Sequence, residues 1–149
     1  MTVQRLEHLV VHSLPEPLKS GILYVTSDQD LAAHLCACGC GKEVITPLSP
    51  TDWELTLRKD VASLWPSIGN WSFPCRSHYI VRGGRVVWAS DMSEAAIQRG
   101  RQSSRTRKDL YYSEQQGNLE NMDVPPSPPS VSKEFFWKSL LARVLRFFT

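Results

Sequence analysis

All four cysteines of the chain fall in two short clusters, and the second cluster also carries a histidine. The first cluster is His34-Leu-Cys-Ala-Cys-Gly-Cys-Gly, and the second is Cys75-Arg-Ser-His78. Thiolate and imidazole are the ligands that zinc prefers, usually four of them at tetrahedral angles. Glycine at positions 39 and 41 suits a knuckle, because a backbone folded around an ion needs residues without a Cβ. The sequence therefore predicts a zinc site whose candidate ligands are Cys36, Cys38, Cys40, Cys75 and His78.

The ligand set stays open at this stage, because the five candidates exceed the usual four and His34 would be a sixth. Either one side chain is spare, or one coordination position is left to water. Disulfides and a free redox thiol are alternatives to the metal. Alternate cysteines in a Cys-x-Cys-x-Cys run are poorly placed to bridge one another. The charged start of the chain differs from a secretory signal and predicts a cytoplasmic protein, where clustered cysteines usually indicate a metal.

Length and composition are those of one globular domain with appendages. The chain has 149 residues, of which 42% are hydrophobic and 21% are charged. A net charge of +2 is too small to indicate nucleic-acid binding, and no nucleic-acid partner is expected. Apolar stretches fall short of the roughly 20 residues that span a membrane.

Residues 1–90 have strand-like patterns and predict a zinc-binding β domain. Gly21–Thr26 has the pattern of a buried strand, residues 43–48 leave the first cysteine cluster, and residues 53–57 alternate with period two. Residues 79–88 hold two apolar runs joined by Gly83-Gly84, which is typical of a hairpin. The expected fold is mainly β, a small antiparallel sheet stapled by zinc, with C-terminal helical segments that make the class α+β overall.

The chain changes character after residue 90. Residues 91–115 predict a basic helical extension in which Ser93 is the N-cap, and its arginines are expected on a solvated face. Residues 116–131 contain Pro125-Pro-Ser-Pro-Pro129 and predict a linker. Residues 132–149 space aromatic and aliphatic side chains as an amphipathic helix does. This last helix is expected to fold back on the domain, with a partner groove as second choice and membrane contact as third.

The same residues support a family resemblance. The quoted segments around Gly21, the first cysteine cluster, Ser63-Leu-Trp-Pro-Ser-Ile-Gly69 and Cys75 through Trp88 resemble a small bacterial family first catalogued as a domain of unknown function. The similarity covers about residues 14–90. It implies a zinc-binding protein encoded beside ubiquitin-like proteins and their activating and conjugating enzymes, which would be its partners. It also implies a peptidase that trims or removes the ubiquitin-like protein.

A zinc peptidase would need an open metal position, and a carboxylate to move the proton of the bound water. Glu43 is the carboxylate nearest to the first cluster in sequence and is the candidate, although a solvated strand end is the simpler interpretation. Ser77 and Ser67 carry hydroxyls that could act as a nucleophile or stabilise an oxyanion. Ser77 could equally fix the Cys75–His78 turn, and His34 could be a base or a structural residue.

Two functions follow from the resemblance and the candidate residues together. The first is a zinc-dependent peptidase of a ubiquitin-like pathway, with Glu43 and Ser77 as catalytic candidates. The second is a non-catalytic adaptor stapled by zinc, because three or four thiolates make a metal a poor Lewis acid. A deaminase is disfavoured, since the His-x-Glu element that such a site needs is missing from the sequence. Coordination separates the two functions: an open metal position favours the enzyme, and a saturated one favours the adaptor.

Overall fold

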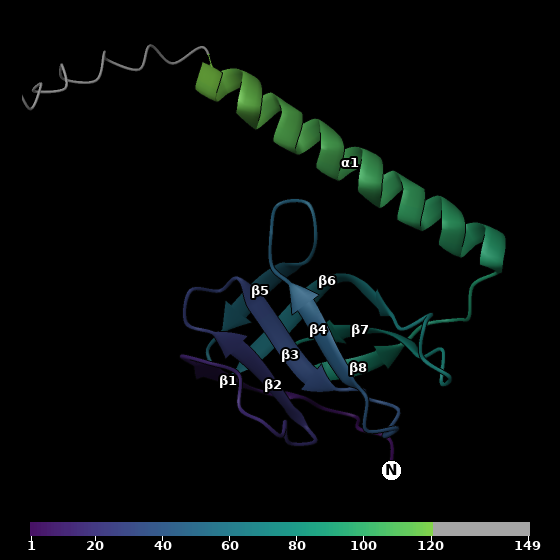
Figure 1. Ribbon diagram of the computed structural model, residues 1–149. Helices are drawn as coiled ribbons and strands as arrows, with labels where there is room; N and C mark the ends of the chain where they lie inside the picture. Colours follow the sequence, from purple (N-terminus) through teal and green to yellow (C-terminus); the bar gives the residue numbers. More distant parts are fainter. Residues whose placement is uncertain (121–149) are drawn as a thin grey trace, which may run out of the picture. The chain divides into compact units, whose positions relative to one another are not determined.

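A computed structural model describes residues 1–120, which form eight strands and one helix. The two sheets have four strands each, and Figure 1 shows them one behind the other. The first sheet contains β1 (Glu7–Val11), β2 (Ile22–Thr26), β3 (Leu31–Leu35) and β4 (Glu43–Pro47) in that order. The second contains β5 (Glu54–Arg58), β6 (Val61–Gly69), β7 (His78–Arg82) and β8 (Arg85–Trp88), also in order. The predicted class, mainly β and α+β overall, is confirmed.

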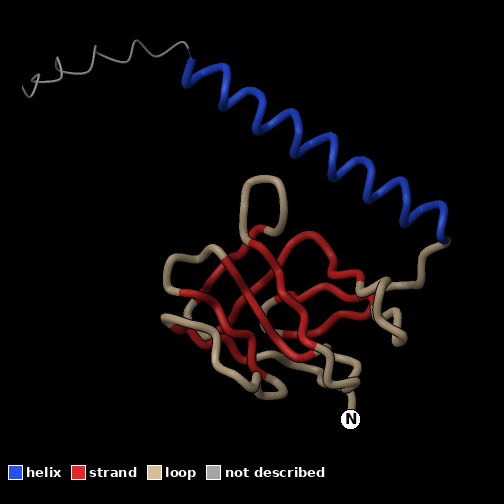
Figure 2. The backbone as a smooth tube through the Cα atoms, viewed as in Figure 1, coloured by secondary structure: helices blue, strands red, loops and turns tan. Residues whose placement is uncertain are grey.

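Strand pairing is antiparallel throughout except for β1, which runs parallel to β2. Tight turns join β5 to β6 and β7 to β8, whereas a longer loop at residues 70–77 joins β6 to β7. Figure 2 draws the strands in red and these connections in tan. The predicted hairpin turn lies between β7 and β8, where Gly83 and Gly84 both adopt positive φ angles. Glycine adopts this conformation without the strain that a Cβ would bring.

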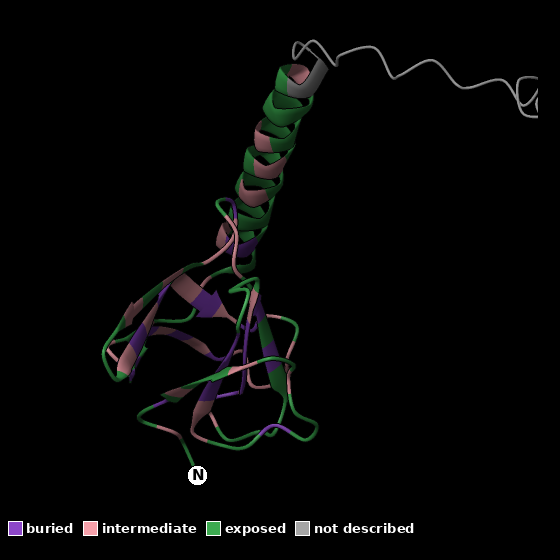
Figure 3. Cartoon of the chain, turned by 90° about the vertical axis from the view of Figure 1, so that its left-hand side faces the viewer, coloured by how far each residue is buried: buried purple, intermediate pink, exposed green. Residues whose placement is uncertain are grey.

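The two sheets share one apolar core, to which both contribute alternate side chains. In Figure 3 the buried segments, in purple, recur along strands of both sheets. The core joins Leu23 and Val25 of β2 to Leu64 of β6 and Val81 of β7. A polar contact lies within it, where the Tyr79 hydroxyl meets His34 Nε2 at 2.8 Å. Burial lowers the pKa of His34 to about 4, so this imidazole is neutral at physiological pH.

Helix α1 (Glu94–Glu120) follows the second sheet. As predicted, Ser93 caps it: the Ser93 hydroxyl accepts a hydrogen bond from the Ala96 amide at 3.3 Å. Residues 1–113 form one compact unit, so this part of α1 belongs with the strands. Within the unit, Lys108 pairs with Asp52 at 2.6 Å and Arg107 donates to the Thr51 carbonyl at 3.2 Å. Among residues 1–120, no helix has both the length and the apolar character of a membrane span.

Helix α1 crosses one boundary of the predicted domain plan. Helical structure spans most of the predicted extension at 91–115 and continues to Glu120, into the first residues of the predicted linker. The rest of that linker and the predicted amphipathic helix at 132–149 lie outside the described residues.

Candidate functional site

The structure brings four thiols together at one end of the two sheets. The sulfur atoms of Cys36, Cys38, Cys40 and Cys75 all lie within 4.8 Å of one another, and none forms a disulfide. Sγ–Sγ distances are 3.4 Å for Cys36–Cys38, 3.9 Å for Cys36–Cys75 and 3.7 Å for Cys40–Cys75. Zinc–sulfur bonds of about 2.3 Å at tetrahedral angles would place the sulfur atoms about 3.8 Å apart. The four side chains therefore fit a tetrahedral metal ion.

The first cysteine segment is a tight knuckle between β3 and β4. The Cys36 amide donates to the Lys42 carbonyl at 2.8 Å, and the Gly39 amide donates to the Cys36 carbonyl at 2.9 Å. Gly39 and Gly41 have φ angles of +83° and +75°, so both glycines lie in the left-handed region. At Gly39 a Cβ would also collide with the Met1 carbonyl. The expectation that these glycines shape a knuckle is confirmed.

Asn70 and Ser77 make polar contacts beside Cys36 and Cys75. The Asn70 side-chain amide donates to Ser77 Oγ at 2.9 Å, and Ser77 Oγ lies 3.0 Å from Cys36 Sγ. Burial raises the pKa of Cys75, but hydrogen bonds from the Ser77 amide and hydroxyl and from neighbouring cysteines outweigh it and lower that pKa to about 7. Burial and the adjacent thiols raise the pKa of Cys38 to about 12. Four thiols this close ionise together readily only when a cation neutralises them.

A second constellation lies on the neighbouring strands β6 and β7. His78 Nε2 is 3.0 Å from Ser67 Oγ, and His78 Nδ1 is 2.7 Å from the Ser90 carbonyl oxygen. A carbonyl oxygen only accepts hydrogen bonds, so Nδ1 carries the proton and Nε2 is the acceptor for the serine hydroxyl. This is the arrangement of a serine nucleophile, a general base and a group that orients the base.

The pairing of β6 with β7 places the serine beside the histidine. Gly69 lies directly opposite His78, and the register of the two strands shifts between Leu64 and Ile68. Side chains two residues apart on a strand share a face, so Ser67 is the diagonal neighbour of His78. The next residue after β8, Ala89, donates its amide to the His78 carbonyl at 2.9 Å, which brings the Ser90 carbonyl to Nδ1.

Trp71 packs against the His78 imidazole, and Arg76 in turn packs on Trp71; these two residues are the support of the imidazole. The Trp71 indole and the His78 ring have centroids 4.9 Å apart, and the Arg76 guanidinium lies over the indole at 5.5 Å. Arg76 also pairs with Glu94 at 2.7 Å and with Asp91 at 3.3 Å. Exposed ion pairs contribute little energy each, but these join the segment after β8 to the loop that carries Trp71.

Gly69 packs closely against this support. A Cβ built on Gly69 would collide with the Trp71 indole ring. We expect Gly69→Ala to displace Trp71, to destabilise the domain by about 1–3 kcal/mol and to lower kcat by about 10- to 100-fold through a misplaced His78. Thermal unfolding and steady-state kinetics measure the two effects. Gly117→Ala is the control, since a Cβ there meets no atom within 4 Å; equal activity of both variants would contradict this role of Trp71.

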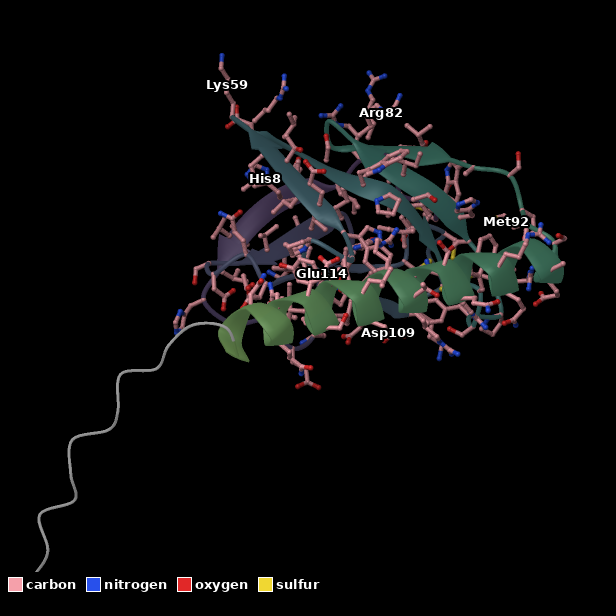
Figure 4. The ribbon with its side chains drawn as sticks, turned by 90° about the horizontal axis from the view of Figure 1, so that it is seen from above. His8, Lys59, Arg82, Met92, Asp109 and Glu114 are labelled. Atoms are coloured by element: carbon pink, nitrogen blue, oxygen red, sulfur yellow. The ribbon has the colours of Figure 1, made fainter. Side chains whose placement is uncertain are left out.

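A cavity of about 360 Å³ opens beside Ser67. One wall is made by β6 and the following loop, with Pro66, Ser67, Gly69 and Trp71. The opposite wall is made by Met92, which Figure 4 labels where the chain enters α1, and by side chains of the first turns of the helix. The volume is in the range of ligand-binding pockets, about 300–1,000 Å³. The serine of the Ser67–His78 pair is therefore accessible to a substrate.

The structure separates the residues that the sequence grouped. Among residues 1–120, the group of metal-capable side chains contains the four cysteines, and His78 and Glu43 lie outside it. Glu43 is exposed at the start of β4, opposite Leu35. Ser77 is buried against Cys36, and His34 is buried against Tyr79. Ser67 was one of two candidate hydroxyls, but its partnership with His78 and the Ser90 carbonyl is visible only in the fold.

Comparison with known proteins identifies the family of the chain. Neither the curated proteins nor the solved structures gave a significant match to the chain. Residues 10–89, more than half of the chain, match the family described as bacterial ubiquitination-like system serine protease (BubE). The match includes both cysteine clusters, Ser67 and His78. It confirms the resemblance to a family of ubiquitin-like pathways, and the chain belongs to the BubE family of bacterial ubiquitination-like system serine proteases.

Proposed function

We propose that this protein is a serine protease that cleaves a ubiquitin-like protein of its own pathway from a precursor or a target, with Ser67 as nucleophile. The observation that carries the proposal is the contact of Ser67 Oγ with His78 Nε2 at 3.0 Å, while Nδ1 of the same ring is held by the Ser90 carbonyl. The description of the family as serine proteases supports it.

The proposed reaction uses these groups in order. As Ser67 Oγ attacks the scissile carbonyl, its proton passes to His78 Nε2, and the Ser90 carbonyl stabilises the imidazolium through the Nδ1 proton. His78 then gives the proton to the leaving amine, and an acyl-enzyme on Ser67 remains. Water, deprotonated by His78, then attacks the acyl carbon; the bond to Ser67 Oγ breaks, and His78 returns the proton to that oxygen. The Ser90 carbonyl takes the place of the usual carboxylate and fixes the same tautomer.

The four cysteines would hold zinc in a structural site. Four thiolates fill the tetrahedron and leave no position for water, so the metal would tie the β3–β4 knuckle to the segment before β7 rather than activate water. Ser77 and Asn70 would orient the ligand Cys36, and we assign them no part in bond cleavage. The zinc-activated water that the sequence favoured, with Glu43 as proton carrier, has less support than Ser67, because four cysteine ligands would leave no open position for a water.

A saturated metal was the feature expected of a non-catalytic adaptor. A saturated metal no longer favours the adaptor, because the Ser67–His78 pair would supply a nucleophile and a base without any metal. The proposal therefore keeps both features, a closed metal site for stability and a metal-free site for catalysis.

Cleavage of the ubiquitin-like protein of the same system, fused through its C-terminus to a reporter, tests the proposal. We expect the purified full chain to release the reporter, and His78→Gln to lower kcat by at least about 10³-fold while folding and zinc content stay unchanged. His12→Gln, at an exposed position, is the matched control. Equal cleavage by both variants, or no cleavage by the zinc-loaded wild type, would overturn the proposal.

A further inference from the structure

Strand β6 has an open edge where it carries Ser67. Strand β5 pairs with residues Val61 to Trp65 only, whereas β6 continues to Gly69. On the other side, β7 pairs with Ile68 and Gly69. In the part of the chain that the structure describes, no strand covers residues 66–69 on the β5 side. An uncovered edge presents backbone donors and acceptors that another strand can use.

The hydrogen bonds of β6 and β7 show which backbone groups face this edge. Asn70 donates its amide to the Ser77 carbonyl at 2.9 Å, so these two residues form a hydrogen-bonded pair. Pairs alternate along an antiparallel ladder, which makes Gly69 and His78 a non-hydrogen-bonded pair. The amide and carbonyl of Gly69 therefore point away from β7, toward the open edge beside Ser67.

The edge faces the 360 Å³ cavity beside Ser67, and a second cavity of about 580 Å³ adjoins it. Both cavities are lined by Trp53 and Pro66, so they lie next to each other along β6. The second cavity has apolar walls from Leu48, Trp53, Leu55 and Trp65. Trp65 lies two residues before Ser67, and its side chain is 60% exposed. Exposed tryptophans at clefts are frequent centres of binding energy.

From this edge and these two cavities we infer the class of substrate: an extended peptide segment that adds to β6 as a strand and seats a large apolar side chain against Trp65. The backbone of the segment would pair with Gly69, and its scissile bond would lie at Ser67. The edge favours an unstructured tail over a folded surface, because a strand needs access to its backbone groups. The inference rests on the proposed function and names the source of its substrate specificity.

Matched fluorogenic peptides test the apolar subsite. In a set that moves one leucine along an otherwise glycine- and serine-rich peptide, we expect one position relative to the cleaved bond to raise kcat/KM by about 10- to 200-fold. Trp65→Ala should remove this preference, so that the leucine peptide and the leucine-free peptide are cleaved with equal kcat/KM. Leu9→Ala, at an exposed apolar position of β1, is the control and should keep the preference. A preference that survives Trp65→Ala would overturn the subsite.

N-methylated peptides test the strand pairing, because a methyl group removes one backbone donor at a time. We expect losses in kcat/KM of about tenfold at alternate residues near the cleaved bond and little effect at the residues between them. Losses without alternation would overturn pairing with β6. Labelling by a fluorophosphonate distinguishes failure of the substrate inference from failure of the proposed function. If wild type and Trp65→Ala label equally at Ser67 but the peptide tests fail, only the substrate inference is wrong. Absence of labelling at Ser67 would overturn the proposed function and the inference together.

Discussion

Replacing Ser67 by alanine is expected to lower kcat for peptide-bond hydrolysis by about 10⁴- to 10⁶-fold and to leave the fold and the metal content unchanged. The reason is that no acyl-enzyme can form without Oγ, while His78 keeps its contact with the Ser90 carbonyl at 2.7 Å. Removal of the hydroxyl costs little stability, because Ser67 lines an open cavity. Steady-state kinetics on the fusion substrate and thermal unfolding measure both properties.

Two other serines make the result specific. Ser103 is exposed on α1, and Ser103→Ala should keep wild-type activity. Ser77→Ala removes a buried hydroxyl that contacts Cys36, so we expect lower stability and a fall in activity that follows the folded fraction. A folded Ser67→Ala variant with wild-type kcat would contradict the assignment of the nucleophile, and a folded, zinc-loaded but inactive Ser77→Ala variant would favour Ser77 instead.

Loss of the metal is expected to unfold the domain rather than to stop catalysis in a folded protein. The ion would join two segments that are 35 residues apart at their nearest cysteines, Cys40 and Cys75. We expect Cys36→Ser or complete chelation to cost at least about 3 kcal/mol of unfolding free energy and to lower Tm by more than about 10 °C. Metal analysis and thermal unfolding, with zinc added back after chelation, provide the measurement.

The relation of activity to folding distinguishes a structural ion from a catalytic one. For a structural ion, activity during chelation falls in parallel with the folded fraction. A metal-free sample that keeps its fold but loses all activity would contradict the structural role and return the catalytic role to the metal.

The sequence predicted the cysteine cluster better than the contact between Ser67 and His78. The cysteine spacing is a local signal, and the two clusters end at or precede strands, so four thiols meet as expected. The β7–β8 hairpin was also predictable, because Gly83-Gly84 specifies its turn within a few residues. The resemblance to a ubiquitin-pathway family came from the same short motifs.

The partnership of Ser67 with His78 could not be predicted from spacing, since it depends on how two strands align. Pro66 interrupts the apolar pattern of β6 and hides that strand in the sequence, and the register shift before Ile68 decides which residue faces His78. Proximity to Cys75 made His78 a candidate ligand in the sequence. Neighbouring residues on a strand point to opposite faces, which directs Ser77 to the sulfur atoms and His78 to Ser67.

Labelling with a fluorophosphonate, followed by mass mapping of the modified peptide, is the most direct test of the central claim that Ser67 is an activated nucleophile. The reagent reacts with a serine whose proton is taken up by an adjacent base, and it needs no knowledge of the natural substrate. The account predicts a single adduct on Ser67 in zinc-loaded wild type, and none in Ser67→Ala or His78→Gln. An adduct on Ser77, or none on any serine of an active, folded protein, would contradict it.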